Sequence, residues 1–152
     1  MAIYAHQVVD AAPPKEIARD PRYKVYRPYG ACEDLLYCKA PEVLICGPAG
    51  TGKSRAALEK IHICAMKYPG SRHLIVRKTR ASLTQSAIVT FEEHVIPESA
   101  GVKFRTSEQE FRYRNGSKVI VGGMDKASKV LSSEYDLIYP QEATELSEDD
   151  WV

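Results

Sequence analysis

An eight-residue stretch rich in glycine constrains the fold of this chain more than any other feature. It follows an apolar run at 43–46 and precedes a helix-forming segment, Arg55 to Lys67. Strand, loop and helix in this order match the complete phosphate-binding pattern G-x-x-x-x-G-K-[ST], known as a P-loop. The residues of the stretch are Gly47, Pro48, Ala49, Gly50, Thr51, Gly52, Lys53 and Ser54. We therefore expect this stretch to bind the phosphates of a nucleotide.

Each part of the pattern has a physical task at a phosphate. Glycines let successive backbone N–H groups turn inward and surround phosphate oxygens, and the positive end of the following helix adds to that field. Lys53 can reach the terminal phosphates, and the Ser54 hydroxyl can bind Mg²⁺. The alternative is a tight turn with a chance Lys-Ser pair, and the full match in this context makes that the weaker interpretation.

Composition places the chain among ordinary soluble proteins with one domain. Its 152 residues are 44% apolar and 27% charged, and this length is sufficient for a well-buried core. The formal net charge of +1 gives no general attraction to nucleic acid, so a DNA contact would need a local basic patch. No apolar run approaches the roughly 20 residues of a membrane span, and Met1 to Asp10 do not resemble a signal peptide. We therefore expect a cytoplasmic protein without a membrane partner.

The cysteines do not form a recognisable framework. None of the four belongs to a Cys-x-x-Cys pair, and no histidine lies at zinc-like spacing from them. We therefore expect neither a structural metal nor a set of disulfides. Cys46, in the predicted strand before the glycine-rich loop, and Cys64, on the following helix, are expected to be buried as small hydrophobic residues.

Strands and helices alternate along the rest of the chain, which predicts an α/β fold with a mostly parallel sheet covered by helices on both faces. Alternation around Asn115-Gly116, the strongest short hairpin signal, adds an antiparallel hairpin at about 110–121. We assign residues 1–25 to an N-terminal extension and 26–152 to the nucleotide-binding domain. The predicted strands are 42–46, 73–78 and 135–139, and the predicted helices are 31–39, 55–67 and 79–97.

The aromatic segment from Tyr23 to Gly30 has two interpretations. Aromatic faces stack on flat bases, so this segment could cover an adenine ring. The simpler interpretation, which we favour, is that its tyrosines pack on the edge of the domain.

A second predicted element of the site lies at the end of the last strand. Loops at the C-terminal ends of neighbouring parallel strands face the same phosphates, and Gln141-Glu142 follows Leu-Ile-Tyr-Pro there. Glu142 is the candidate catalytic carboxylate that orients or activates water. Gln141 is the candidate metal ligand, because its carbonyl oxygen can hold a Mg²⁺-bound water without adding charge. Asp136 opens this strand, so it should lie at the opposite edge of the sheet.

Positive charge on the transferring phosphoryl group is the third requirement. Arg77, Lys78 and Arg80 leave the second predicted strand at the same edge as the glycine-rich loop, and Arg77 and Arg80 are the candidate catalytic arginines. A solvated basic loop is the alternative for each of them. Lys78 and Arg80 could also join Lys126 and Lys129 in a patch that binds the phosphate backbone of DNA.

Taken together, these motifs resemble a known family, the large subunit of the terminase of tailed phages, in its N-terminal ATPase domain. The resemblance covers roughly residues 26–150. It rests on the glycine-rich loop, Leu-Ile-Val-Arg-Lys-Thr at 74–79, Phe-Arg-Tyr-Arg-Asn-Gly-Ser-Lys-Val-Ile at 111–120, Gly-Gly-Met-Asp at 122–125 and Ser-Glu-Tyr-Asp-Leu-Ile-Tyr-Pro-Gln-Glu-Ala-Thr-Glu-Leu at 133–146.

The resemblance implies a P-loop NTPase fold of the ASCE or RecA type that binds ATP and Mg²⁺ and drives double-stranded DNA into a procapsid. It implies ATP binding by Gly47–Ser54, a catalytic glutamate at Glu142 and a phosphate contact by an arginine near 77–80. It also implies a homo-oligomeric ring on the portal protein, a small terminase subunit as partner, and a separate C-terminal nuclease domain.

Two departures from the family pattern stand out. Gln141 replaces the usual acidic residue, which predicts weak Mg²⁺ binding. The sequence ends ten residues after Glu142, so we expect an incomplete core that lacks the family's next strand and its nuclease. The alternatives are a helicase-type P-loop ATPase fragment, which has no need of the 110–121 hairpin, and a non-catalytic nucleotide-binding assembly module.

Overall fold

The protein is represented by a computed structural model that describes residues 21–84, 86–126 and 133–150. The sheet strands are β1 (Arg72–Arg77), β2 (Lys103–Arg105), β3 (Glu110–Arg112), β4 (Lys118–Gly123) and β5 (Leu137–Pro140). The α-helices are α1 (Ala31–Tyr37), α2 (Lys53–Lys67), α3 (Arg80–Thr84) and α4 (Ala87–Thr90). A π-helical turn spans Phe91–Val95, and 3₁₀ turns span Glu98–Ala100, Met124–Lys126, Ala143–Glu145 and Glu148–Asp150.

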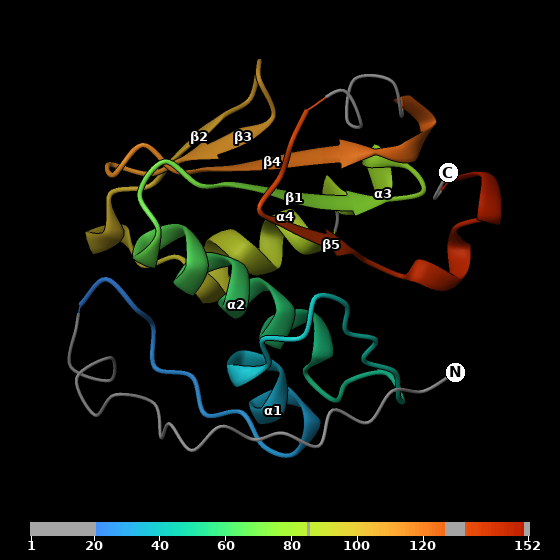
Figure 1. The fold of residues 1–152 in the computed structure, drawn as a ribbon. Coiled ribbons are helices and arrows are strands. Elements are labelled where there is room, and N and C mark those ends of the chain that lie inside the picture. Colours follow the sequence, from blue (N-terminus) through green and yellow to red (C-terminus); the bar gives the residue numbers. More distant parts are fainter. Residues whose placement is uncertain (1–20, 85, 127–132, 151–152) are drawn as a thin grey trace.

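A five-stranded mixed sheet forms the centre of the fold, in the order β2-β3-β4-β1-β5 (Figure 1). β1 pairs in parallel with both β4 and β5, whereas β3 is antiparallel to β2 and β4. The predicted hairpin is therefore confirmed, with Asn115-Gly116 in its turn, and β2 extends it by a strand that the sequence analysis did not predict. The α/β class is confirmed as well.

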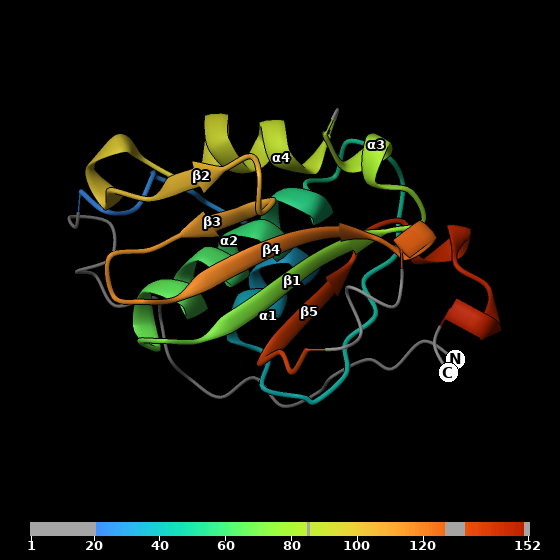
Figure 2. The same cartoon turned by 90° about the horizontal axis from the view of Figure 1, so that it is seen from above.

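The helices that pack on the sheet cover one face of it, where we predicted two. Figure 2 shows the sheet in front of α1 and α2. The main core lies between that face and α2, α3, α4 and the π-helical turn, and it contains Leu58, Ile61, Ile75, Leu83, Phe91, Phe111 and Val119. The opposite face carries a smaller cluster formed by Leu74, Val76 and Met124, against which Ile120, Tyr135 and Leu146 pack. No helix in the described ranges is both long and apolar enough to cross a membrane.

The predicted strand at 42–46 is wrong, because this segment forms no strand in the structure. Val43 is 45% exposed and Leu44 59% exposed, and Cys46 is exposed rather than buried. The segment pairs with no strand of the sheet. Strand formation requires a backbone partner as well as suitable side chains, and this segment has the side chains alone.

The remaining predicted elements are shifted or divided rather than absent. α2 has the predicted buried face, with Leu58, Ile61 and Ala65 fully covered. The helix predicted at 79–97 is divided into α3, α4 and the π-helical turn, in which the Ile96 N–H bonds to the Phe91 carbonyl at 2.9 Å. Single π-turns interrupt helices in this way.

Candidate nucleotide-binding site

The N-terminal end of α2 lies on the side of the molecule toward which β1, β4 and β5 point (Figure 1). Gly50 and Gly52 have φ angles of 77° and 83°, in the left-handed region that glycine adopts without strain. The first bond of α2 runs from the Ala56 N–H to the Gly52 carbonyl at 2.9 Å. The preceding N–H groups, including those of Lys53 and Ser54, have no acceptor within the helix. This end of α2 can therefore hold an anion.

The Lys53 side chain folds back over the glycine-rich loop. Its ammonium group donates to the carbonyls of Gly47 at 2.8 Å and Pro48 at 2.5 Å, and it lies 3.2 Å from Thr51 Oγ1. Thr51 in turn donates to the Pro48 carbonyl at 3.0 Å. The N–H donors of the Lys53 ammonium, which a phosphate would use, are therefore bound to neutral oxygens. Because the loop is exposed, an incoming phosphate can replace these oxygens.

Ser54 connects the helix to the end of β5. Its side chain is hydrogen-bonded to Tyr139, and burial, the largest influence, raises the pKa of this tyrosine. Tyr139 therefore stays neutral near pH 7. The bond brings the predicted Mg²⁺ ligand Ser54 next to the strand that leads into Gln141 and Glu142.

Gln141 and Glu142 follow β5 but differ in exposure. Gln141 is buried, its N–H donates to the Val76 carbonyl at 2.8 Å, and its Oε1 lies 3.4 Å from Ser86 Oγ. Glu142 is exposed and has a φ of 53°, a conformation that L-residues rarely adopt. Such strain costs about 1–3 kcal/mol and is concentrated at functional sites. No signal in the sequence indicated either the strain at Glu142 or the contact between Gln141 and Ser86.

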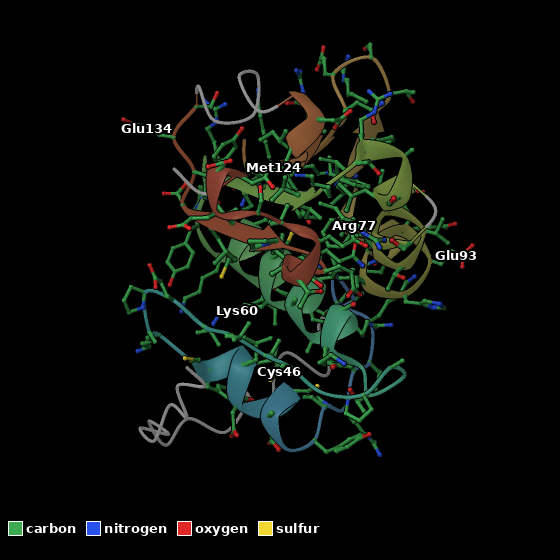
Figure 3. All side chains as sticks on the ribbon, turned by 90° about the vertical axis from the view of Figure 1, so that its right-hand side faces the viewer. Cys46, Lys60, Arg77, Glu93, Met124 and Glu134 are labelled. Carbon is green, nitrogen blue, oxygen red and sulfur yellow. The ribbon has the colours of Figure 1, made fainter. Side chains whose placement is uncertain are left out.

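Two of the three basic candidates form ion pairs with acidic residues near the end of the described chain. Arg77 forms two bonds with Glu145, at 2.9 and 2.6 Å, and these raise the pKa of Arg77 and lower that of Glu145. Figure 3 shows Arg77 on the side of the molecule that carries the strand ends. Lys78 bonds to Asp150 at 2.7 Å, which lowers the pKa of Asp150 to about 2.

Arg80 begins α3. Its backbone lies so close to Gly123 that a side chain at position 123 would collide with the Arg80 backbone. The structure describes only part of the predicted DNA patch, which therefore stays a prediction. Lys78 is engaged with Asp150, Lys129 lies outside the described residues, and the side chain of Lys126 is not described either.

The aromatic segment lies against the glycine-rich loop. A pocket of about 170 Å³ is lined by residues 26–29 together with Cys32, Gly50, Thr51, Gly52 and Arg55. The Arg55 guanidinium stacks 5.1 Å from the centre of the Tyr26 ring and donates to Glu59 at 2.7 Å. Tyr26 packs on the cluster formed by Cys32, Leu35, Ala56 and Ala57, as expected for a domain edge, whereas Tyr29 is 73% exposed beside the pocket.

The structure thus brings some of the predicted site residues together, while others bind residues that were not predicted as partners. The hydrogen bond between Ser54 and Tyr139 joins the glycine-rich loop to the end of β5. Gln141 is near Ser86, and Arg77 is paired with Glu145. Asp136 lies at the opposite edge, as predicted, where its Oδ2 accepts the Arg72 N–H at 2.8 Å.

Comparison with known proteins gives one match. The family model for the phage terminase large subunit matches residues 40–152, a range that includes the glycine-rich loop and every predicted catalytic residue. Searches of the curated proteins and of the solved structures found no match.

Proposed function

Because the chain belongs to the phage terminase large subunit family, which supports a role in phage DNA packaging, we propose that it binds ATP with Mg²⁺ at Gly47–Ser54 and hydrolyses it to drive DNA movement. The observation that carries the proposal is the open N-terminal end of α2. There, N–H groups without helical acceptors and the Lys53 ammonium are collected beside an exposed glycine-rich turn.

Binding would begin with an exchange of acceptors. The phosphates would take the place of the Gly47 and Pro48 carbonyls at the Lys53 ammonium, and charge-assisted bonds to phosphate are stronger than bonds to neutral carbonyls. The base would lie in the pocket beside Tyr26 and Tyr29, because aromatic rings offer flat faces to a purine.

The oxygen ligands near the loop are of the type that Mg²⁺ prefers, but they carry no negative charge. The Ser54 hydroxyl and the Gln141 amide oxygen are hard oxygen ligands, and Gln141 is neutral, so the metal would depend on the phosphates for charge. When bound, Mg²⁺ would neutralise charge on the phosphates. We therefore expect weak Mg²⁺ binding in the absence of nucleotide.

Glu142 would act as the carboxylate that accepts a proton from the attacking water. It stands in the turn that follows β5, in a strained conformation that the following 3₁₀ turn holds through the bond from the Glu145 N–H to the Glu142 carbonyl at 2.9 Å. Arg77 would have to exchange Glu145 for phosphate before it could stabilise the transition state. Arg80 is the other proposed phosphate contact.

The wider assembly is proposed on the family relationship. The portal protein, a small terminase subunit, double-stranded DNA and a homo-oligomeric ring would be the partners of the complete motor. A non-catalytic nucleotide-binding module is the second candidate, favoured by the pairing of Arg77 with Glu145. We expect slow hydrolysis by the isolated chain, since this pair must open before Arg77 can act.

Calorimetric titration with Mg·ATP tests the binding site. Lys53→Ala should weaken ATP binding by roughly 10–100-fold, the effect of losing charge-assisted bonds of about 1.5–3 kcal/mol. Lys67→Ala is the matched control, because it removes an exposed lysine from the other end of the same helix. Equal affinity in the Lys53→Ala variant and the wild type would overturn the proposal.

A further inference from the structure

The face of the sheet that carries no helix is crossed by a row of basic residues. Lys103 of β2 is the register partner of Arg112 of β3. Arg112 is in turn the partner of Lys118 of β4, and Lys118 is the partner of Arg72 of β1. Four strands therefore contribute one basic residue each to a single line, which we call the basic row. Figure 2 shows these strands side by side in front of α2.

The alternation of side chains along β2 and β3 shows which way one half of the basic row points. Phe104 and Phe111 pack in the main core, on the face of the sheet that the helices cover. Neighbouring residues of a strand point to opposite faces, so Lys103 and Arg112 point away from the helices. Arg105, two residues after Lys103, points in the same direction as Lys103.

The other half of the basic row points the same way. Leu74 and Ile120 belong to the smaller cluster on the face opposite the helices. Arg72 lies two residues before Leu74, and Lys118 lies two residues before Ile120, so each shares that face. The basic row is therefore assembled by the sheet from positions that are far apart in the sequence.

Carboxylates hold the centre of the basic row in place. Glu110 and Glu108 both form ion pairs with Arg112, and Glu110 also lies 3.7 Å from the Lys118 ammonium. These two carboxylates offset part of the positive charge on β3 and β4.

The two ends of the basic row are not neutralised in this way. Lys103, Arg105 and Arg72 are exposed, and within the described ranges none of them forms an ion pair. The Arg72 guanidinium lies 5.9 Å from the centre of the Tyr135 ring, and Asp136 Oδ2 accepts the Arg72 backbone N–H instead of the guanidinium. These three cations are therefore available to an anion from outside the chain.

The spacing of the basic row suits the backbone of a nucleic acid. Neighbouring strands are about 4.8 Å apart, so the row of four residues is about 14 Å long. One strand of B-DNA presents a phosphate for about every 3.4 Å of helix axis, or about four phosphates over that length. The row and the DNA backbone thus carry opposite charge at a similar density.

We propose that this sheet face binds the phosphate backbone of double-stranded DNA, with the basic row and Arg105 as the contacts. The choice of partner rests on the proposed function. A duplex is favoured over a single strand, because surfaces for single strands stack the bases on exposed aromatic rings. The aromatic residues of β2 and β3, Phe104 and Phe111, pack in the core instead. Phosphate contacts carry no sequence information, so this binding should be independent of sequence.

Fluorescence anisotropy with a labelled duplex two helical turns long, about 20 base pairs, tests the proposal in the absence of nucleotide. Lys103→Gln combined with Arg105→Gln should weaken binding by about tenfold at about 50 mM salt. It should also reduce the slope of log K against log salt by about 2, and Arg72→Gln should reduce it by about 1. Lys39→Gln combined with Lys67→Gln is the matched control, because it removes the same charge from exposed positions outside this face.

Three results would overturn the proposal. One is an equal loss of DNA binding in the control and in the β2 variant, and another is no binding of the duplex by the wild type at low salt. The third is tighter binding of single-stranded DNA of the same length, or of polyglutamate, which would favour that partner instead. Affinity for Mg·ATP, measured by calorimetry, should be the same in all these variants, so a failure of the nucleotide site can be told apart from a failure of this face.

Discussion

The two ends of α2 treat their unsatisfied backbone groups in opposite ways. At the C-terminal end, Asn115 Nδ2 donates to the carbonyls of Ala65 at 2.8 Å and Met66 at 3.2 Å, and Ser117 donates to the Tyr68 carbonyl. At the N-terminal end, the first N–H groups point to an exposed glycine-rich turn. The hairpin thus closes one end of the helix and leaves the other end free for a ligand. Substitutions at the closed end should change stability, and substitutions at the open end should change chemistry.

Glu142→Gly should have the largest effect, a loss of ATP hydrolysis without a loss of stability. Loss of the carboxylate should lower the rate of ATP hydrolysis by about 10²–10⁴-fold, measured by phosphate release. The free energy of unfolding, measured by thermal unfolding, should rise by about 1 kcal/mol, because glycine adopts the φ of 53° without strain. Gln109→Gly is the matched control, since Gln109 has a φ of 54° in the turn before β3. It should be stabilising without any change in hydrolysis, and a similar loss of hydrolysis there would remove the special role of Glu142.

Glu59, between the two ends, should make stability depend on pH. Burial, the largest influence, raises the pKa of Glu59 from 4.5 to about 7 despite the opposing effect of Arg55. Between these values the folded state binds more protons than the unfolded state, so the free energy of unfolding should fall as pH rises. The expected loss is roughly 2–3 kcal/mol from pH 5 to about pH 8, most of it below pH 7, with little further change above.

Glu59→Gln isolates this effect in urea unfolding at several pH values. His62 and His73, whose pKa values are lowered by burial, should act in the opposite direction below pH 6.5. Their contribution is common to both proteins and is removed when the variant is subtracted from the wild type. A difference that is constant with pH would contradict the raised pKa of Glu59.

Asn115→Ala should destabilise the closed end by about 1–2 kcal/mol, because two helix carbonyls lose their donor. Urea unfolding measures the loss, and calorimetry on the folded variant should give an unchanged affinity for ATP. A large loss of ATP affinity would show that the two ends of α2 are not independent.

Local patterns in the sequence were sufficient for the elements with local causes. The glycine-rich turn, the buried face of α2 and the Asn115-Gly116 hairpin each depend on residues within a few positions. The role of Asn115 as a cap of α2 was not predictable, because the contact with Ala65 spans 50 residues.

Distant pairing explains the errors. Val43 and Leu44 have the side chains of a strand, but no strand of the sheet pairs with them in the structure. The pairing of Arg77 with Glu145, 68 residues away, was likewise not predicted, and the predicted phosphate contact of Arg77 stays a prediction. We predicted helices on both faces of the sheet, and they cover one. A buried strand has an apolar sequence whether a helix or another segment covers it, so the sequence does not show which of them lies on a face.

An NMR titration of the ¹⁵N-labelled chain with Mg·ATP tests the division of α2 most directly. The account predicts that the amide resonances of Gly50, Gly52, Lys53 and Ser54 shift, while those of Asn115 and Gly116 stay in place. Shifts confined to the closed end, or an absence of shifts at the glycine-rich loop at millimolar ATP, would contradict it.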